Sequence, residues 1–417
     1  MSGLRRGIKP SCQGVFRLKA FMAVAATGES IHTPAAPAAR SRAAVRLWLY
    51  VLAALVVAMV AVGGATRLTG SGLSITEWRP VTGAIPPLSE AAWAAEFEKY
   101  RASPQYALLN QGMSLSEFRF IYWWEWGHRQ LGRLIGLAFF VPFLWFWAKG
   151  FLSRRLALTL LAIGALGGLQ GAVGWIMVAS GLEPGMIAVA PVKLTLHLLI
   201  ASAILVALLW VATGLRGGAG SEGTEFPPSP GRAARDSTLG SGPEGRLSPS
   251  GGEASLPRSA LVLLALVFLQ IALGGLVAGS KAGLTYNTWP LMDGRLAPPL
   301  QDLFAVSPWI ENFVDNVALV QLNHRLVAVA VVAFAIWHAV AARRMDSAGE
   351  GWTAARRADL LAALALAQMA LGIATLVLAV PLWAGLAHQI LAMAVLGTAA
   401  VHARLCILPS SAAFSSH

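Results

Sequence analysis

The sequence contains 417 residues, of which 56% are hydrophobic and only 12% are charged. Soluble globular proteins have about 25% charged residues, so this composition excludes an ordinary soluble protein. The net charge of +12 would suit a nucleic-acid-binding protein. However, the lysines and arginines lie mostly in short segments between apolar blocks, which is typical of membrane proteins, and we expect no nucleic-acid partner. The two cysteines, Cys12 and Cys406, are too few for a disulfide framework, a zinc ribbon or an iron–sulfur site.

Eight apolar blocks follow one another along the chain. Each is long enough to cross a bilayer, which takes about 20 residues of helix. The sequence therefore predicts an all-α membrane protein with eight transmembrane helices. The expected spans are residues 46–66, 130–148, 156–178, 192–213, 259–279, 318–341, 358–380 and 383–405.

The segments between the spans alternate in charge. The N-terminal tail (1–45), the loop 149–155 and the loop 342–357 are rich in arginine and lysine, whereas the loop 280–317 carries four acids and two basic residues. By the positive-inside rule, both termini are expected in the cytoplasm. The arginine-rich tail resembles a mitochondrial presequence, but the excess of arginine over lysine favours a bacterial inner-membrane protein over a mitochondrial inner-membrane one.

A segment rich in glycine, proline and serine, residues 214–258, divides the chain and is expected to be a disordered linker. The halves on either side, 46–213 and 259–405, resemble each other, and a short C-terminal tail, 406–417, follows. Five features recur at a constant offset of 211 residues: Gly63-Gly64, Gly72-Leu73, Trp78, Gly83 and Pro87 correspond to Gly274-Gly275, Gly283-Leu284, Trp289, Gly294 and Pro298. The sequence therefore predicts two duplicated four-helix bundles.

Four histidines occupy matching positions in the predicted repeats. His128 corresponds to His324, and His197 to His388, each expected a few residues inside an even-numbered helix. Polar groups inside a membrane cost free energy, so four at similar depth need a functional cause. Two facing imidazoles in a four-helix bundle can bind haem iron from opposite sides, so we expect these four histidines to be axial haem ligands.

Charged residues accompany the first histidine of each half. Arg129 follows His128 and Arg325 follows His324; each could contact haem propionates or extend to the outer interface, and the sequence leaves this open. Glu125 lies three residues before His128 and therefore shares its helix face, whereas the corresponding residue of the second half is Gln321. A carboxylate can move protons and an amide cannot. This difference predicts chemistry in the first half and a non-reacting haem in the second, unless Glu125 is simply a solvated acid.

Two further histidines favour a different function. His338 follows His324 by 14 residues, and His402 follows His388 by 14, so each pair shares a helix face about 21 Å apart. This spacing would suit two stacked haems in a cytochrome b-like electron-transfer protein. The other interpretation is that both are histidines at the inner interface.

The combined motifs resemble those of haem A synthase, in the larger form found in mitochondria and alphaproteobacteria. The resemblance extends from about residue 46 to 405, without the linker. One departure is that no cysteine pair stands in an outer loop, as it does in some bacterial members. The matching residues are Gly63 to Ser74 (GGATRLTGSGLS), Glu125-Trp126-Gly127-His128-Arg129, Asn323-His324-Arg325, His197 and His388.

The resemblance implies a function for each of these positions. His128 and His197, with Arg129, would bind the substrate haem O; His324 and His388, with Arg325, would hold haem b as cofactor. Glu125 would be the catalytic carboxylate in oxidising the C8 methyl group of haem O to a formyl group. The product, haem A, would serve terminal cytochrome oxidases. The expected partners are therefore the lipid bilayer, haem O synthase and oxidase assembly factors, and a homo-oligomer is left open.

Overall fold

The computed structural model describes residues 35–216, 255–345 and 354–408. Residues up to Ser41 form a separate unit, of which only a helical stretch is described. Eight described helices are long and apolar enough to cross a membrane, which confirms the predicted all-α fold with eight spans. They are α2 (Ala35–Leu68), α5 (Leu115–Ala148), α6 (Arg154–Gly181), α7 (Pro191–Gly214), α8 (Ser255–Gly279), α10 (Val317–Met345), α11 (Ala354–Val377) and α12 (Leu382–Ile407).

Several predicted boundaries were wrong. Helix α5 begins at Leu115 rather than at residue 130, because Ser114 and Glu117 form a capping box at its N-terminus. The polar residues of this first part concealed it from a search for apolar blocks. Helix α2 begins within the predicted tail, and α12 extends to Ile407 within the predicted C-terminal tail. Residues 217–254 of the expected linker lie outside the described residues, while α8 already begins at Ser255.

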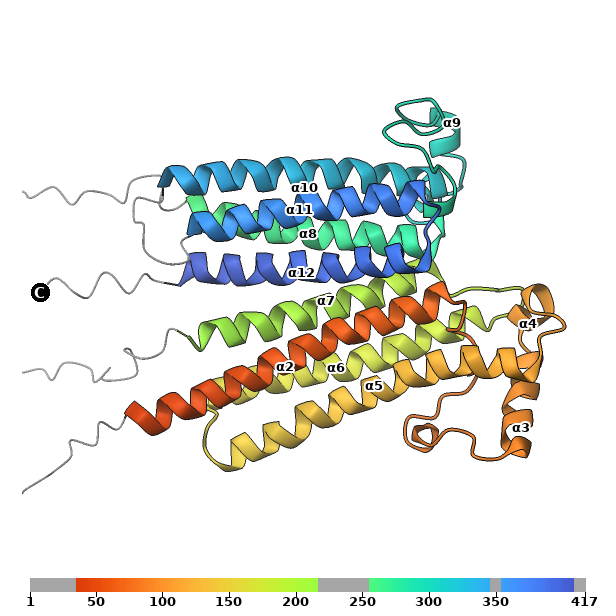
Figure 1. The fold of residues 1–417 in the computed structure, drawn as a ribbon, viewed down its shortest axis with the longest axis horizontal. Coiled ribbons are helices and arrows are strands. Elements are labelled where there is room, and N and C mark those ends of the chain that lie inside the picture. The colour runs from red at the N-terminus through yellow and green to blue at the C-terminus, as the bar shows by residue number, and fades with distance from the viewer. Residues whose placement is uncertain (1–34, 217–254, 346–353, 409–417) are drawn as a thin grey trace, which may run out of the picture. The chain divides into compact units, whose positions relative to one another are not determined.

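The helices of the second half form a closed set of neighbours. Helix α8 contacts α10 and α12, and α11 contacts both α10 and α12 (Figure 1). In the first half, α6 packs between α5 and α7. Helix α2 packs on α5 through Trp48, whose ring lies 5.6 Å from Phe139 and 5.4 Å from Phe146. Apolar side chains from all eight helices form one core.

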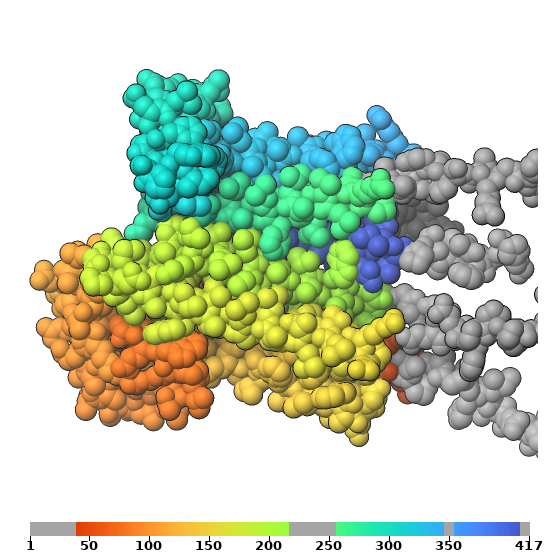
Figure 2. Space-filling model, turned by 180° about the vertical axis from the view of Figure 1, so that it is seen from behind, coloured from red at the N-terminus to blue at the C-terminus, as the bar shows by residue number. Residues whose placement is uncertain are grey.

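Helix α7 joins the two halves. It contacts α8 and α12 of the second half, and α7 and α8 lie side by side on the face seen in Figure 2. A second link is polar: Gln389 of α12 donates a hydrogen bond from Nε2 to the Val60 carbonyl of α2, at 3.1 Å. The halves are therefore held together by both apolar and polar contacts.

The two long loops lie at the same end of the helices (Figure 1). The loop after α2 contains η1 (Thr82–Ala84), α3 (Glu90–Arg101) and α4 (Pro104–Leu109); the loop after α8 contains η2 (Ala282–Leu284), α9 (Leu300–Leu303) and η3 (Trp309–Phe313). Helix α3 packs against the N-terminal turns of α5. The contact is an aromatic cluster that includes Trp93, Tyr100, Phe118 and Tyr122, so the loop is a packed platform above the start of α5.

Candidate functional site

Each of the four predicted histidines packs against a glycine on another helix. A Cβ atom built on Gly63 would lie 2.6 Å from Cε1 of His128, and one on Gly174 would lie 2.8 Å from Cε1 of His197. In the second half, the same distance is 3.3 Å from Gly274 to His324 and 2.7 Å from Gly372 to His388. At three of the four positions any side chain would collide with the imidazole, so glycine makes the space that the ring occupies.

The four histidines lie on four different helices: His128 on α5, His197 on α7, His324 on α10 and His388 on α12. His197, His324 and His388 lie within about two turns of the start of their helices, as expected. His128 is the exception, because the capped extension of α5 places it fourteenth in its helix.

Glu125 is buried, with only 3% of its surface exposed. Its Oε2 accepts hydrogen bonds from the Ser74 hydroxyl and the Ile75 backbone N–H, both at 2.8 Å. Its Oε1 accepts from Arg129, one turn along the helix, at 2.6 Å. The interpretation of Glu125 as a solvated interfacial acid is therefore wrong: the carboxylate is held by three groups within the protein.

The Arg129 side chain is held by several groups of the protein. Beyond Glu125, its guanidinium donates to the carbonyls of Ile75 and Glu77, at 2.8 and 2.9 Å, and lies over the ring of Trp175. One side chain therefore ties the loop after α2 to the helix that carries His128. Sequence reasoning missed this ion pair, although the spacing of four residues between Glu125 and Arg129 indicates one.

The second half has the same arrangement without the carboxylate. Gln321 donates to the Ala282 carbonyl at 2.7 Å and accepts from Arg325 at 3.1 Å. Arg325 also donates to the Tyr286 carbonyl of the loop after α8, at 2.7 Å. Both arginines thus bond carbonyls of the long loop of their half, while the residue one turn before them is a carboxylate in the first half and an amide in the second.

Two glutamines that sequence reasoning missed contact the histidines of the second half. Gln270 Nε2 lies 3.1 Å from Nδ1 of His324, and Gln368 Nε2 lies 3.2 Å from Nδ1 of His388. Each glutamine stands four residues before the glycine against which its histidine packs. The same Gln-x-x-x-Gly spacing occurs in the first half at Gln170 and Gly174.

His338 and His402 form a separate cluster. Their Nε2 atoms are 2.7 Å apart in a direct hydrogen bond, and His338 Nδ1 is 2.9 Å from the Ser259 hydroxyl. Cys406 Sγ lies 3.6 Å from His402 Nε2. A metal–imidazole bond is about 2 Å long, so an iron between these nitrogens would hold them about 4 Å apart. The cluster therefore does not have the spacing that the cytochrome b-like alternative requires.

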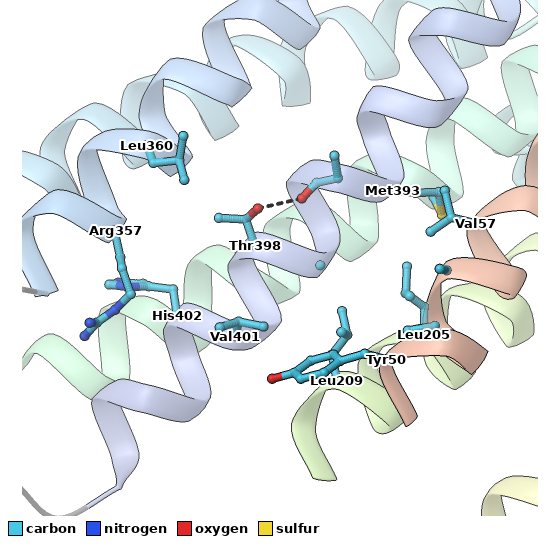
Figure 3. A pocket seen from close by; sticks show the side chains of 14 residues that line it. Tyr50, Val57, Leu205, Leu209, Arg357, Leu360, Met393, Thr398, Val401 and His402 are labelled. Carbon is cyan, nitrogen blue, oxygen red and sulfur yellow. Dashed lines mark hydrogen bonds between the residues drawn. The ribbon is translucent and has the colours of Figure 1, made fainter. Parts of the chain in front are cut away.

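A cavity of about 570 Å³ lies between α2, α7, α11 and α12. Figure 3 shows Arg357 and His402 at one end of it and Met393 and Val57 at the other. Neither Glu125 nor any of the four predicted histidines lines it. The cavity is therefore distinct from the candidate site.

Comparison with known proteins identifies the family of the chain. Residues 46–400 match the family described as cytochrome oxidase assembly protein. The chain is 64% identical over 372 residues to heme A synthase of Methylobacterium sp. (strain 4-46), which covers 88% of this chain and 93% of the relative. It is 63% identical to heme A synthase of Methylobacterium radiotolerans, over 88% of this chain and 91% of that one. The heme A synthase of Azorhizobium caulinodans is 50% identical, over 88% of this chain and 95% of that relative.

The family match covers all the residues of the candidate site, from Gly63 to His388. It also covers six of the eight spans completely and most of the other two, α2 and α12. The chain is a multi-pass membrane protein, and it belongs to the family of cytochrome oxidase assembly proteins.

Proposed function

We propose that the protein is a haem A synthase, which oxidises the C8 methyl group of haem O to a formyl group. The observation that carries the proposal is the placement of Glu125. A buried carboxylate, fixed by Ser74, Ile75 and Arg129, lies three residues from His128. The names of the relatives, which cover about nine tenths of their own length and of this chain, support the same activity.

Haem O is the proposed substrate, with His128 and His197 as its axial ligands, and haem b is the proposed cofactor of His324 and His388. The residues fit such groups. The four histidines lie on different helices, each against a glycine of another helix, and Nδ1 of His128 is buried without a hydrogen-bond partner among the described residues, which supports this assignment. When bound, the iron supplies the redox chemistry that side chains lack.

Glu125 is the group proposed to manage protons in this reaction. Removing hydrogen from a methyl group requires a proton acceptor or a negative charge that stabilises a developing cation. Hydrogen bonds from Ser74, Ile75 and Arg129 hold the carboxylate and fix its direction. Gln321 offers neither charge nor basicity at the corresponding position, which supports the assignment of the reaction to the first half.

The proposed location is the bacterial plasma membrane with both termini in the cytoplasm. The relatives are bacterial. Basic residues gather at the helix ends opposite the long loops: Lys149, Arg154 and Arg155 between α5 and α6, and Arg343, Arg344, Arg356 and Arg357 near the ends of α10 and α11. Positive residues are enriched on the cytoplasmic side of membrane proteins. The site would then face the extracytoplasmic side.

The test is Glu125→Gln in protein co-expressed with a source of haem O. Because general acid–base catalysis contributes about 10²–10⁴-fold, haem A formation should fall at least 100-fold while haem O remains bound. Extracted pigments are separated by chromatography. The matched control is Glu117→Gln, an exposed carboxylate on the same helix. Haem A formation at the normal rate in the Glu125 variant, or no haem bound to the wild-type protein, would contradict the proposal.

A further inference from the structure

The two halves differ in how their imidazoles are held. In the second half, Gln270 contacts the ring of His324, with Nε2 at 3.1 and 3.3 Å from the two ring nitrogens. The same amide nitrogen donates to the backbone carbonyl of His324, at 3.1 Å. The Gln270 amide therefore contacts both the ring and the backbone carbonyl of His324, and this fixes the direction of the His324 side chain.

Gln368 makes the same set of contacts with His388. Its Nε2 lies 3.2 and 3.3 Å from the ring nitrogens and 3.0 Å from the backbone carbonyl. Oε1 of both glutamines is buried without a hydrogen-bond partner among the described residues. A primary amide both donates and accepts. If the histidine bound iron through its ring Nε2, its Nδ1 would carry the hydrogen. Rotation of the glutamine amide would then let the amide oxygen Oε1 accept a hydrogen bond from that Nδ1–H.

The first half lacks this support at His128. The position that corresponds to Gln270, at the offset of 211 residues, is occupied by Met59. The thioether cannot hold an imidazole as an amide does, and the Met59 methyl group lies against Gly132, one turn beyond His128 on α5, at 3.3 Å from a Cβ built there. Nδ1 of His128 has no hydrogen-bond partner in the described part of the chain.

We propose that Gln270 and Gln368 are positioning residues that make the haem of the second half a permanent one, and that Met59 leaves His128 unsupported so that the first half can exchange its haem. The inference rests on the proposed function, in which the first half takes up haem O and releases haem A. Hydrogen-bond partners of metal-ligating histidines typically change metal affinity 10–100-fold. A substrate site needs the weaker hold and a cofactor site the stronger one.

The test exchanges the two residues. Haem release from the purified full-length protein to excess apomyoglobin is followed separately for haem b and for haem O or haem A, by chromatography of the extracted pigments. In the wild type, the first-half haem should leave at least tenfold faster. Gln270→Met should speed release of haem b about tenfold or more, and Met59→Gln should slow release from the first half.

Gln389→Met is the matched control. Gln389 is adjacent to His388, but its amide bonds the Val60 carbonyl instead of an imidazole. This variant should release haem b at the wild-type rate. A spectroscopic measurement separates positioning from folding: in Gln270→Met and Gln368→Met, the paramagnetic resonance of the second-half haem should shift while the melting temperature stays near that of the wild type.

Three outcomes would overturn the inference. Gln270→Met and Gln368→Met could keep haem b as the wild type does, Met59→Gln could leave release unchanged, or Gln389→Met could release haem b as fast as Gln368→Met. In each case the wild type would still bind haem in both halves, so the proposed function would stand. Wild-type protein without haem in either half would instead contradict both proposals.

Discussion

Glu125 and Arg129 form an ion pair across one turn of α5, with Oε1 of the carboxylate 2.6 Å from the guanidinium. The pair is mostly buried, with 4% and 18% of the two side chains exposed. The same arginine bonds the carbonyls of Ile75 and Glu77, while Ile75 N–H bonds the carboxylate. Carboxylate, arginine and loop therefore depend on one another.

Replacement of Arg129 by leucine should affect both folding and activity. The change leaves the buried Glu125 carboxylate without its counter-charge, and breaking one side of a buried ion pair costs about 3–5 kcal/mol. We expect a lower melting temperature in detergent and haem A formation reduced at least tenfold. Arg325→Leu is the control, because its partner Gln321 is neutral; an equal loss of stability in both variants would show that the charge pair is unimportant.

The glycines beside the histidines provide a second prediction. Gly174→Ala would place a Cβ 2.8 Å from Cε1 of His197, so the imidazole must move. We expect this variant to lose the haem of the first half and keep that of the second. Gly171→Ala, one turn earlier on α6, has no atom within 4 Å of its Cβ and should bind both haems. The measurement is the haem content of purified protein; equal content in the two variants would refute the contact.

The pair of His338 and His402 should matter for stability and not for haem content. Both rings are buried, at 0% and 1% exposure, and each is the hydrogen-bond partner of the other. Changing both to alanine removes the pair and leaves cavities, which we expect to cost about 2–5 kcal/mol, as large-to-small core substitutions do. Pigment analysis should find unchanged haem, whereas loss of one haem would revive the cytochrome-like alternative.

Tyr100 gives the loop platform a dependence on alkaline pH. Burial raises the pKa of its phenol above the usual value, while the hydrogen bond from Asn110 acts in the opposite direction. The pKa of the Tyr100 phenol is therefore higher in the folded protein than in the unfolded chain. Its contribution to the free energy of unfolding is complete below the unfolded pKa of about 10 and is lost as the pH rises through the folded pKa.

Tyr100→Phe should therefore flatten the fall in stability above about pH 10. Thermal unfolding at pH 8 and at pH 10.5, followed by circular dichroism, would measure the difference. The other tyrosine of the α3–α4 platform, Tyr106, serves as the control, because its phenylalanine variant should keep the alkaline fall. If the Tyr100→Phe variant lost as much stability between the two pH values as the wild type, Tyr100 would not be the cause of the alkaline fall.

The sequence was sufficient to predict eight spans because a bilayer imposes one length and one kind of surface on each helix. It failed for the start of α5, where Glu117 and Arg119 made the helix look like a loop. That segment is helical because a capping box begins it and because α3 packs against it. The packing of α3 joins residues that are distant in the chain, so the local sequence does not reveal it.

The site was predicted unevenly for similar reasons. The four histidines could be found because they recur in both halves and are rare inside membranes. The ring contacts of Gln270 and Gln368 could not, because a glutamine in an apolar helix shows no sign of which side chain it meets. The bonds from Ser74 and Ile75 to Glu125 likewise join residues about 50 positions apart, which only the fold brings together.

Gln389 has a consequence for how the two halves move. It is adjacent to His388, and its amide reaches the Val60 carbonyl, three residues before the glycine that touches His128. Gly64 leaves the space for that amide, since a Cβ there would overlap it. Sliding one half past the other by a single residue, about 1.5 Å of helix rise, would break this bond. This bond therefore opposes sliding of α12 along α2, next to His388 and to the glycine that packs on His128.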